Sequence, residues 1–468
     1  MIVVMGAGLA GLSAASVLSR SGLKTTVVEK DSGTGGLAKT ICHNGFRFDL
    51  GGHRFLTKNL RVERFVRNLL KDSILTTHRK SSIFMFNRYF DYPLKPLNAV
   101  FGMGTLKTSG ILCDYIKEKA KGFVSRPDLV SLEDWVVNRF GRRMFNIYFK
   151  EYSEKVWGID CSRISSEWVA ERIKGLSLHE AMLNAFFRFS GKDIPTLADS
   201  FIYPRMGIGQ ISEALASRIR YRDNILSDTR ALQINHEAYK VESISVTDGS
   251  DVYDIEGSEF ISSIPLPNLI KGLHPSPPDN VLHAASCLKF RDLIIVTLML
   301  DCNRVSDLTW IYLPEKKMPI GRVHEPKNWS GCMAPDGFTH LVSEYFCFRN
   351  DTIWRKSNAE LIGTTARHLS SIGFMTEKEV IDASVIRVPD AYPVLTVDYS
   401  RHYRTVLDYL DNFKNLHIIG RGGMFRYYNM DQAIETGMNT AERIIKTMQG
   451  PKYTIQDARR RMTDTVTV

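Results

Sequence analysis

The sequence predicts an α/β protein made of a dinucleotide-binding domain, an inserted helical lobe and a β-sheet substrate lobe. Three observations lead to this fold class. A β-branched run at the N-terminus ends in a glycine-rich loop and passes into a helix-like pattern. A second strand–glycine–helix pattern lies near the C-terminus, and between the two the periodicity is first helical and then strand-like. Because the two dinucleotide-type patterns stand far apart in the chain, we expect that domain to be discontinuous.

The expected domain ranges follow from where these patterns change. They are 1–75, 200–268 and 385–450 for the dinucleotide-binding domain, 95–199 for the helical lobe, 76–94 and 269–384 for the sheet lobe, and 451–468 for a polar basic tail.

The N-terminal loop has the spacing of a phosphate-binding turn. In the run Gly6-Ala7-Gly8-Leu9-Ala10-Gly11 the first glycine permits the tight turn and the second lets backbone approach a pyrophosphate. The third lets the following helix pack closely on its strand, and that helix offers unpaired N–H groups to phosphates. A second strand, KTTVVEK, ends in Glu29-Lys30, which puts an acidic residue where ribose hydroxyls are bound. Together these features predict a bound dinucleotide.

Two further glycine pairs follow early in the chain. Gly35-Gly36 precedes Leu37 and Ala38, and the segment GFRFDLGGHRF supplies Gly51-Gly52-His53-Arg54. A plain NAD domain does not need these turns. With them the sequence resembles FAD-binding flavoenzymes of the glutathione-reductase type. The resemblance implies that the first pair lies along FAD and that the second brings a loop, with His53 and Arg54, to the isoalloxazine ring.

The C-terminal pattern consists of an expected strand at Leu416–Gly420, a loop, and a helix from about Met430. In a flavoprotein this arrangement places a helix N-terminus near the flavin, where its partial positive charge favours an anionic reduced ring. Asp431 is then either an N-cap or a neighbour of the ribityl chain or pyrophosphate. The expected FAD neighbours in this part are Arg421, Met430, Asp431 and Gln432.

The middle of the chain supplies the two lobes. Apolar residues of the 132–145 stretch recur at helical spacing, so residues 100–190 are expected to be mostly helical. RDLIIVTLML and THLVSEYFCF predict strands between residues 280 and 350. Strands expected around 224–265 would rejoin the FAD domain.

Composition limits the class of protein. The 468 residues are 44% hydrophobic and 24% charged, as is typical of a soluble globular protein, and no apolar run is long enough for a transmembrane helix. A motif that starts at residue 2 leaves no room for a signal peptide. The seven cysteines are scattered without a CxxC pair, which favours reduced thiols in a cytoplasm and no metal site. The net charge of +10 comes without a long basic run, so we expect no nucleic-acid partner and instead arginines that serve anionic small molecules.

Several ordered motifs carry a closer resemblance. EYSEKVWG, DYPLKPLN, GRVHEPKNW, DAYPVLT and GRGGMFRYYNMD make the chain similar to UDP-galactopyranose mutases from residue 2 to about residue 447. These flavoenzymes interconvert the pyranose and furanose rings of a nucleotide sugar. The chain also resembles the wider group of FAD-dependent amine oxidases and protoporphyrinogen oxidases, which shares the FAD domain.

The mutase resemblance implies roles for individual residues. Tyr152 and Trp157 would flank the uridine. Arg172 and Arg322 would clamp the substrate diphosphate, since a guanidinium offers a rigid donor fork. The residues expected beside the flavin and the substrate phosphates are Tyr392, Tyr427, Arg421 and His53. For each of these, ordinary packing or surface ion pairing is the competing interpretation.

One departure bears on the substrate. Asn429 stands where many bacterial mutases have an acidic residue, which removes a charge near the sugar. The hexose could therefore differ from galactose, and UDP- and dTDP-hexoses both remain candidate substrates. A homodimer is also left open.

Two reaction types compete. In a mutase, N5 of reduced FAD attacks the anomeric carbon, the nucleoside diphosphate leaves, and the sugar recloses through another hydroxyl before the diphosphate returns; NAD(P)H or another reductant would reduce the flavin. In an FAD-dependent oxidase or dehydrogenase, hydride passes from an amine, an alcohol or a ring carbon to the flavin. Because both use the same FAD domain, the fold alone does not separate them.

Overall fold

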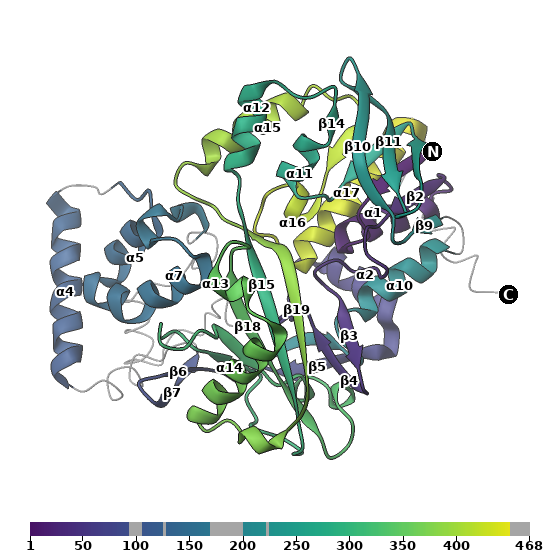
Figure 1. Ribbon diagram of the computed structural model, residues 1–468. Helices are drawn as coiled ribbons and strands as arrows, with labels where there is room; N and C mark the ends of the chain where they lie inside the picture. The colour runs from purple at the N-terminus through teal and green to yellow at the C-terminus, as the bar shows by residue number, and fades with distance from the viewer. Residues whose placement is uncertain (93–104, 125–127, 169–199, 221–223, 450–468) are drawn as a thin grey trace.

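The structure is a computed structural model and describes residues 1–92, 105–124, 128–168, 200–220 and 224–449. Figure 1 shows three parts: a group of helices on the left, a long sheet in the centre, and an α/β unit at the upper right.

The α/β unit contains a five-stranded parallel sheet whose strands come from distant parts of the chain. Its order is β20-β13-β1-β2-β9. The strands are β1 (Ile2–Met5), β2 (Thr25–Val28), β9 (Asn224–Leu226), β13 (Glu259–Ser262) and β20 (Leu416–Ile418). The N-terminal, middle and C-terminal segments therefore meet in one sheet, and the predicted fold class is confirmed.

Two long helices pack closely beside this sheet because glycines remove side chains at the contact. They are α1 (Leu9–Arg20) and α17 (Met430–Gln449). A Cβ on Gly437 would lie 2.1 Å from the Ala10 carbonyl oxygen, and one on Gly11 would lie 2.0 Å from that of Gly6. Neither position accepts a larger residue without moving backbone, so these glycines set how closely α1 approaches its neighbours.

Further elements surround the parallel sheet. A four-stranded sheet has the order β12-β11-β10-β14, and two antiparallel two-stranded sheets pair β3 with β4 and β5 with β8. The strands are β3 (Thr40–His43), β4 (Phe46–Asp49), β5 (Ile74–His78), β8 (Ser200–Pro204), β10 (Arg230–Glu237), β11 (Lys240–Thr247), β12 (Val252–Glu256) and β14 (Leu273–His274). The helices are α2 (Leu60–Leu70), α10 (Gln210–Arg220), α11 (Leu266–Lys271), α12 (Asp279–Cys287), α15 (Tyr399–Leu410) and α16 (Gly420–Gly423).

The central sheet has seven strands in the order β19-β15-β18-β17-β16-β6-β7. They are β6 (Ser81–Met85), β7 (Arg88–Tyr92), β15 (Phe290–Leu300), β16 (Trp310–Tyr312), β17 (Arg322–His324), β18 (Thr339–Cys347) and β19 (Val380–Pro393). Every residue of β15 is buried. Leu293 and Ile295 face a core shared with the helical part, whereas Ile294 and Val296 face a core shared with α14 (Asn358–Ser371). The continuous apolar run RDLIIVTLML thus belongs to a strand covered on both faces.

The helical part stands beside one end of this sheet (Figure 1). Its elements are α4 (Thr105–Val124), α5 (Leu132–Phe140), α6 (Arg142–Met144), a π-helical turn (Phe145–Lys150) and α7 (Glu151–Trp157). A short 3-10 turn, Cys161–Arg163, follows, and α13 (Thr352–Arg355) lies near the end of β18. A π-helical turn directly before α7 is a feature that often accompanies functional sites.

Some expected ranges differ in detail from the elements. The expected boundary at 384/385 falls inside β19, and the one at 75/76 falls inside β5. Neither strand has a glycine or proline at that point to mark an end in the sequence. The strand expected at Leu416–Gly420 ends at Ile418, and Gly420, at φ +71°, begins the short helix α16.

Across the described residues, none of the helices combines the length and apolar character needed to cross a membrane.

Candidate active site

The predicted phosphate-binding loop is shaped by close backbone contacts. Gly8 is the N-cap of α1, no side chain caps this helix end, and its first turn contains no acidic residue. A Cβ on Gly36 would lie 3.2 Å from the Cα of Gly8, so the two glycine turns touch. Glu29 is buried, and its carboxylate accepts hydrogen bonds from the backbone N–H groups of Ala7 (2.7 Å) and Asp31 (3.0 Å). The result is an uncapped helix N-terminus behind a narrow cradle, which suits a pyrophosphate.

The second glycine pair forms a loop tied to the central sheet. The Gly52 N–H donates to Oε1 of Glu344 at 3.0 Å, and a Cβ on Gly52 would lie 1.6 Å from the Trp310 ring. Next to it, removal from water and the neighbouring Arg421 cation lower the pKa of His53 to about 4. His53 is therefore a neutral imidazole at pH 7, with Nδ1 3.2 Å from the Gly51 carbonyl oxygen.

Arg322 lies opposite this loop. On β17 it pairs across the sheet with Glu344 on β18, and its Nη1 is 3.3 Å from Glu344 Oε2. Its Nε donates to the Tyr152 hydroxyl of α7 at 2.9 Å. The Glu344 side chain is 0% exposed, and burial raises its pKa while the Arg322 cation opposes that rise. One buried carboxylate thus holds both Arg322 and the Gly52 loop.

Three residues from the C-terminal part complete the cluster. The rings of Tyr392 and Tyr427 are stacked, with centroids 5.4 Å apart, and the Arg421 guanidinium lies 5.2 and 5.1 Å from their centroids. Burial raises the pKa of Tyr392 to about 12, against the nearby cations of Arg322 and Arg421, which lower it. The Tyr392 phenol is therefore a neutral hydroxyl, and two guanidinium groups lie near it.

Buried polar atoms near the glycine loops remain unpaired. Among the described residues, Nη1 of Arg54 and Oδ1 of Asp431 are buried and have no hydrogen-bond partner. Arg54 follows the Gly52 loop and packs on the Trp310 ring at 4.8 Å, and Asp431 lies in the first turn of α17. Unpaired buried groups are costly, so a polar ligand is expected to satisfy them. With the Gly8–Gly36 cradle, these residues fit a flavin dinucleotide.

Comparison with known proteins identifies the family. The pattern described as "Flavin containing amine oxidoreductase" matches residues 9–445, almost the whole chain. The chain belongs to this family.

Its relatives within the family carry different activities in their names. A phytoene desaturase of Fusarium fujikuroi is 24% identical over a 281-residue alignment that covers 53% of this chain and 47% of that protein. The chain thus spans about half the length of the curated relatives it matches. A solved structure of reduced UDP-galactopyranose mutase superposes with a TM-score of 0.83 at 20% identity, covering 95% of this chain and 94% of that one. A putative protoporphyrinogen oxidase from Exiguobacterium sp. 255-15 gives a TM-score of 0.73 at 17% identity, covering 95% and 98%.

This flavoenzyme brings most of the residues implied by the mutase resemblance together. Tyr152, Arg322, Tyr392, Arg421 and Tyr427 form the cluster described above, with His53 beside Arg421. Arg172 lies outside the described residues.

The other two implied substrate residues, Trp157 and Asn429, differ in burial. Trp157 is 2% exposed and packs edge-to-face against Trp168 and Tyr427, with centroids 5.0 and 5.7 Å away. In this structure it therefore packs edge-on against the Tyr427 ring and is itself almost fully buried. Asn429 is exposed, and its backbone N–H donates to Gln432 Oε1 at 3.0 Å.

The remaining predicted cofactor residues surround the cradle. Leu9, Ala10 and Ala38 are buried, Leu37 and Met430 are half-buried, and Lys30 and Gln432 are exposed.

Sequence reasoning missed Glu344, which the flavoenzyme buries at the centre of the site. A single acidic residue inside the apolar strand THLVSEYFC was the available signal, because a buried charge needs a partner.

Proposed function

We propose that this flavoenzyme is a sugar-nucleotide mutase that interconverts the pyranose and furanose forms of an NDP-hexose. One observation carries the proposal. Arg322, paired with the buried Glu344 carboxylate, lies among the hydroxyl-bearing rings of Tyr152, Tyr392 and Tyr427, and the Arg421 guanidinium lies over the last two rings, beside the loop expected to face the flavin. Such a cluster suits a diphosphate better than an apolar or cationic substrate.

The residues have separate tasks in this reaction. Reduced FAD, when bound, would supply the nucleophile that displaces the nucleoside diphosphate from the anomeric carbon. Arg322 and Arg421 would bind the departing diphosphate and keep it near the sugar for its return, a proximity effect. Tyr392 keeps its proton at neutral pH, since its pKa is raised to about 12, and so can donate a hydrogen bond to a phosphate oxygen.

An FAD-dependent oxidoreductase is the second candidate, and the family and the phytoene desaturase relative favour it. Arg322 already bonds Glu344 and Tyr152, and Arg421 bonds two backbone carbonyls, but a hydrocarbon substrate would offer no acceptor to either guanidinium, whereas a diphosphate would. The charge of the site therefore supports the mutase over an oxidoreductase for hydrocarbons.

Anaerobic incubation with a panel of UDP- and dTDP-hexoses tests the proposal. The dithionite-reduced protein is expected to convert one of them into an isomer of unchanged mass, separable by chromatography, and the oxidised protein is expected not to. Mass-shifted products with matching reduction of the flavin by substrate would contradict the mutase and support the oxidoreductase. The Arg322→Ala variant tests whether the activity resides at this site.

A further inference from the structure

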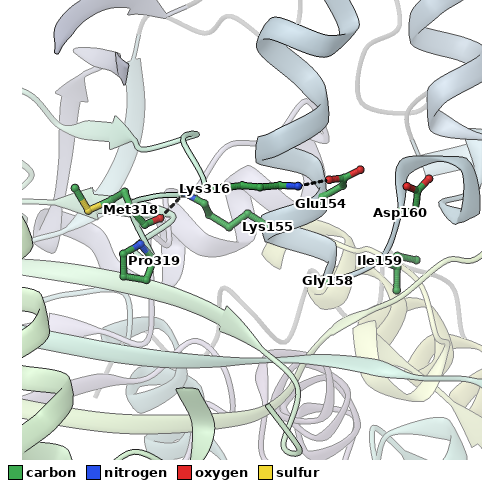
Figure 2. A pocket seen from close by; sticks show the side chains of 8 residues that line it. All are labelled: Glu154, Lys155, Gly158, Ile159, Asp160, Lys316, Met318 and Pro319. Atoms are coloured by element: carbon green, nitrogen blue, oxygen red, sulfur yellow. Dashed lines mark hydrogen bonds and ion pairs between the residues drawn. The ribbon is translucent and has the colours of Figure 1, made fainter. Parts of the chain in front are cut away.

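The helix that carries Tyr152 is fastened to the loop that precedes Arg322. Helix α7 runs alongside residues 313–320, which connect the antiparallel strands β16 and β17 (Figure 2). The hairpin closes with Tyr312 opposite Arg322 and with the Leu313 N–H donating to the Gly321 carbonyl at 3.0 Å. Whatever holds this loop against α7 therefore also sets the position of Arg322 relative to Tyr152.

Lys155 makes the most buried part of this connection. Its Nζ lies 2.6 Å from the carbonyl oxygen of Leu313, 2.7 Å from those of Glu315 and Met318, and 3.4 Å from that of Ile320. An ammonium group has three donors, so the hairpin loop satisfies all of them with backbone carbonyls. The loop in turn has several of its otherwise open carbonyls satisfied by one cation.

We propose that Lys155 is a positioning residue that locks the 313–320 loop onto α7 and so holds the Tyr152 hydroxyl and the Arg322 guanidinium in diphosphate-binding geometry. This inference rests on the proposed nucleotide-binding function of Arg322. Lys155 itself is turned toward the loop and acts on the substrate only through the two residues it positions.

Other contacts hold α7 without engaging the loop carbonyls. Lys316 donates from its backbone N–H to Glu151 and from Nζ to Glu154, at 3.0 and 2.9 Å. Behind the helix, the buried Arg291 of β15 donates to the carbonyl oxygens of Lys155 (3.2 Å) and Val156 (3.0 Å). The Arg291 bonds keep α7 in place, and the two exposed Lys316 bonds keep part of the loop beside it, so loss of the Lys155 contact is expected to loosen the loop and not to unfold the helix.

The Lys155 ammonium can exchange its proton with solvent. An open hollow of about 520 Å³, lined by Lys155, Lys316 and Met318 among others, reaches the contact (Figure 2). Burial lowers the pKa of Lys155 to about 7, although the carboxylates of Glu151 and Glu315 oppose the shift. The other charged groups around it are Glu154, Asp160, Lys316, Lys317 and Arg291. Above pH 7 the neutral amine has one N–H fewer and no charge, so its hold on the carbonyls weakens.

The test is titration of the FAD-loaded protein with UDP-galactose, followed by the flavin spectrum between pH 6.0 and 8.5. A diphosphate diester lacks the second phosphate ionisation near pH 6, so the ligand does not titrate in this range. At pH 6.5 we expect Lys155→Met to raise the Kd at least fivefold and Lys155→Arg to restore part of the affinity. The Kd of wild type is expected to rise as the pH rises, whereas the Kd of Lys155→Met should change little with pH. Lys150→Met is the matched control, because the Lys150 side chain is 42% exposed and, within the described part of the chain, forms one ion pair, at 4.0 Å from Glu154.

Three results would overturn the inference. If wild type and Lys155→Met bind equally well, Lys155 does not position the site, while the proposed function stands. If wild type shows no binding to UDP-galactose or to any other nucleotide sugar, the proposed function fails and the role of Lys155 fails with it. If Lys155→Met does not fold, the wild-type pH profile decides, and a Kd constant from pH 6.0 to 8.5 contradicts the inference.

Discussion

Replacing Arg322 by alanine removes the cation that faces the Glu344 carboxylate across two paired strands. Glu344 is 0% exposed, and in the described structure it then keeps the Gly52 N–H as a hydrogen-bond partner and the Arg54 cation as a more distant charge. Removing one member of a buried ion pair costs about 3–5 kcal/mol, because the other charge stays buried without compensation. We expect a loss of about 3 kcal/mol at pH 7.5, towards the low end because the Gly52 bond remains.

Equilibrium urea unfolding of the FAD-saturated protein measures this loss. The double variant Arg322→Ala, Glu344→Gln removes the charge together with its partner and should recover at least about 1 kcal/mol, within the range for residues in contact. In Arg322→Ala the pKa of Glu344 should rise further above its unfolded value, so the variant gains stability as the pH falls and loses it as the pH rises. Equal destabilisation of the single and double variants, with no dependence on pH, would refute the buried ion pair.

The remaining predictions concern the rest of the site. Tyr392→Phe and Tyr427→Phe keep the stacked rings but lose the hydroxyls, so each should weaken UDP binding by about 1 kcal/mol without lowering FAD content, as measured by titration of the flavin spectrum. Gly11→Ala places a Cβ 2.0 Å from the Gly6 carbonyl oxygen and should reduce the amount of FAD bound per chain. Gly33→Ala is its control, because a Cβ there meets nothing within 4 Å. Equal FAD content in the two variants would contradict the role of the Gly6–Gly11 turn in binding FAD. The pKa of His53 is lowered from 6.5 to about 4, so between these pH values the unfolded chain binds more protons than the folded one. The stability that depends on neutral His53 is therefore lost as the pH falls from 6.5 to 4. His53→Gln should make the urea midpoint less dependent on pH in this window than it is in wild type, and an unchanged pH profile would contradict the shift.

The flavin half of the molecule could be predicted from the sequence because its signals are local. Each signal lies within a short stretch of sequence: the turn at Gly6–Gly11, the strand that ends in Glu29, and the helix from Met430. The structure joins the corresponding strands in one parallel sheet. The domain limits were harder to predict from the sequence, because β19 runs through the expected boundary at 384/385, where no residue would end a strand.

The substrate half depends on pairings that no local pattern contains. The contact of Arg322 with Glu344 exists because β17 and β18 pair in a register that puts these two residues opposite each other. In the sequence Lys155 looks like an ordinary lysine on a helix surface, and its role depends on the β16–β17 loop, which only the fold places beside it. Trp157 was interpreted from the resemblance as a nucleobase neighbour, whereas burial against Trp168 and Tyr427 follows from how α7 meets the rest of the core.

The central claim is that this cationic, tyrosine-rich cluster binds a nucleoside diphosphate. Titration of the flavin spectrum with UDP tests it most directly, comparing wild type with the Arg322→Ala, Glu344→Gln double variant, in which Glu344 no longer leaves a buried charge without Arg322. Arg67→Ala is the control, because that arginine is exposed and its side chain pairs, among the residues that the structure describes, with Glu63 one helical turn away. We predict unchanged binding in the control and a loss of about 1.5–3 kcal/mol in the double variant, the range for a hydrogen bond to a charged group. Equal UDP affinity in all three proteins would contradict the account.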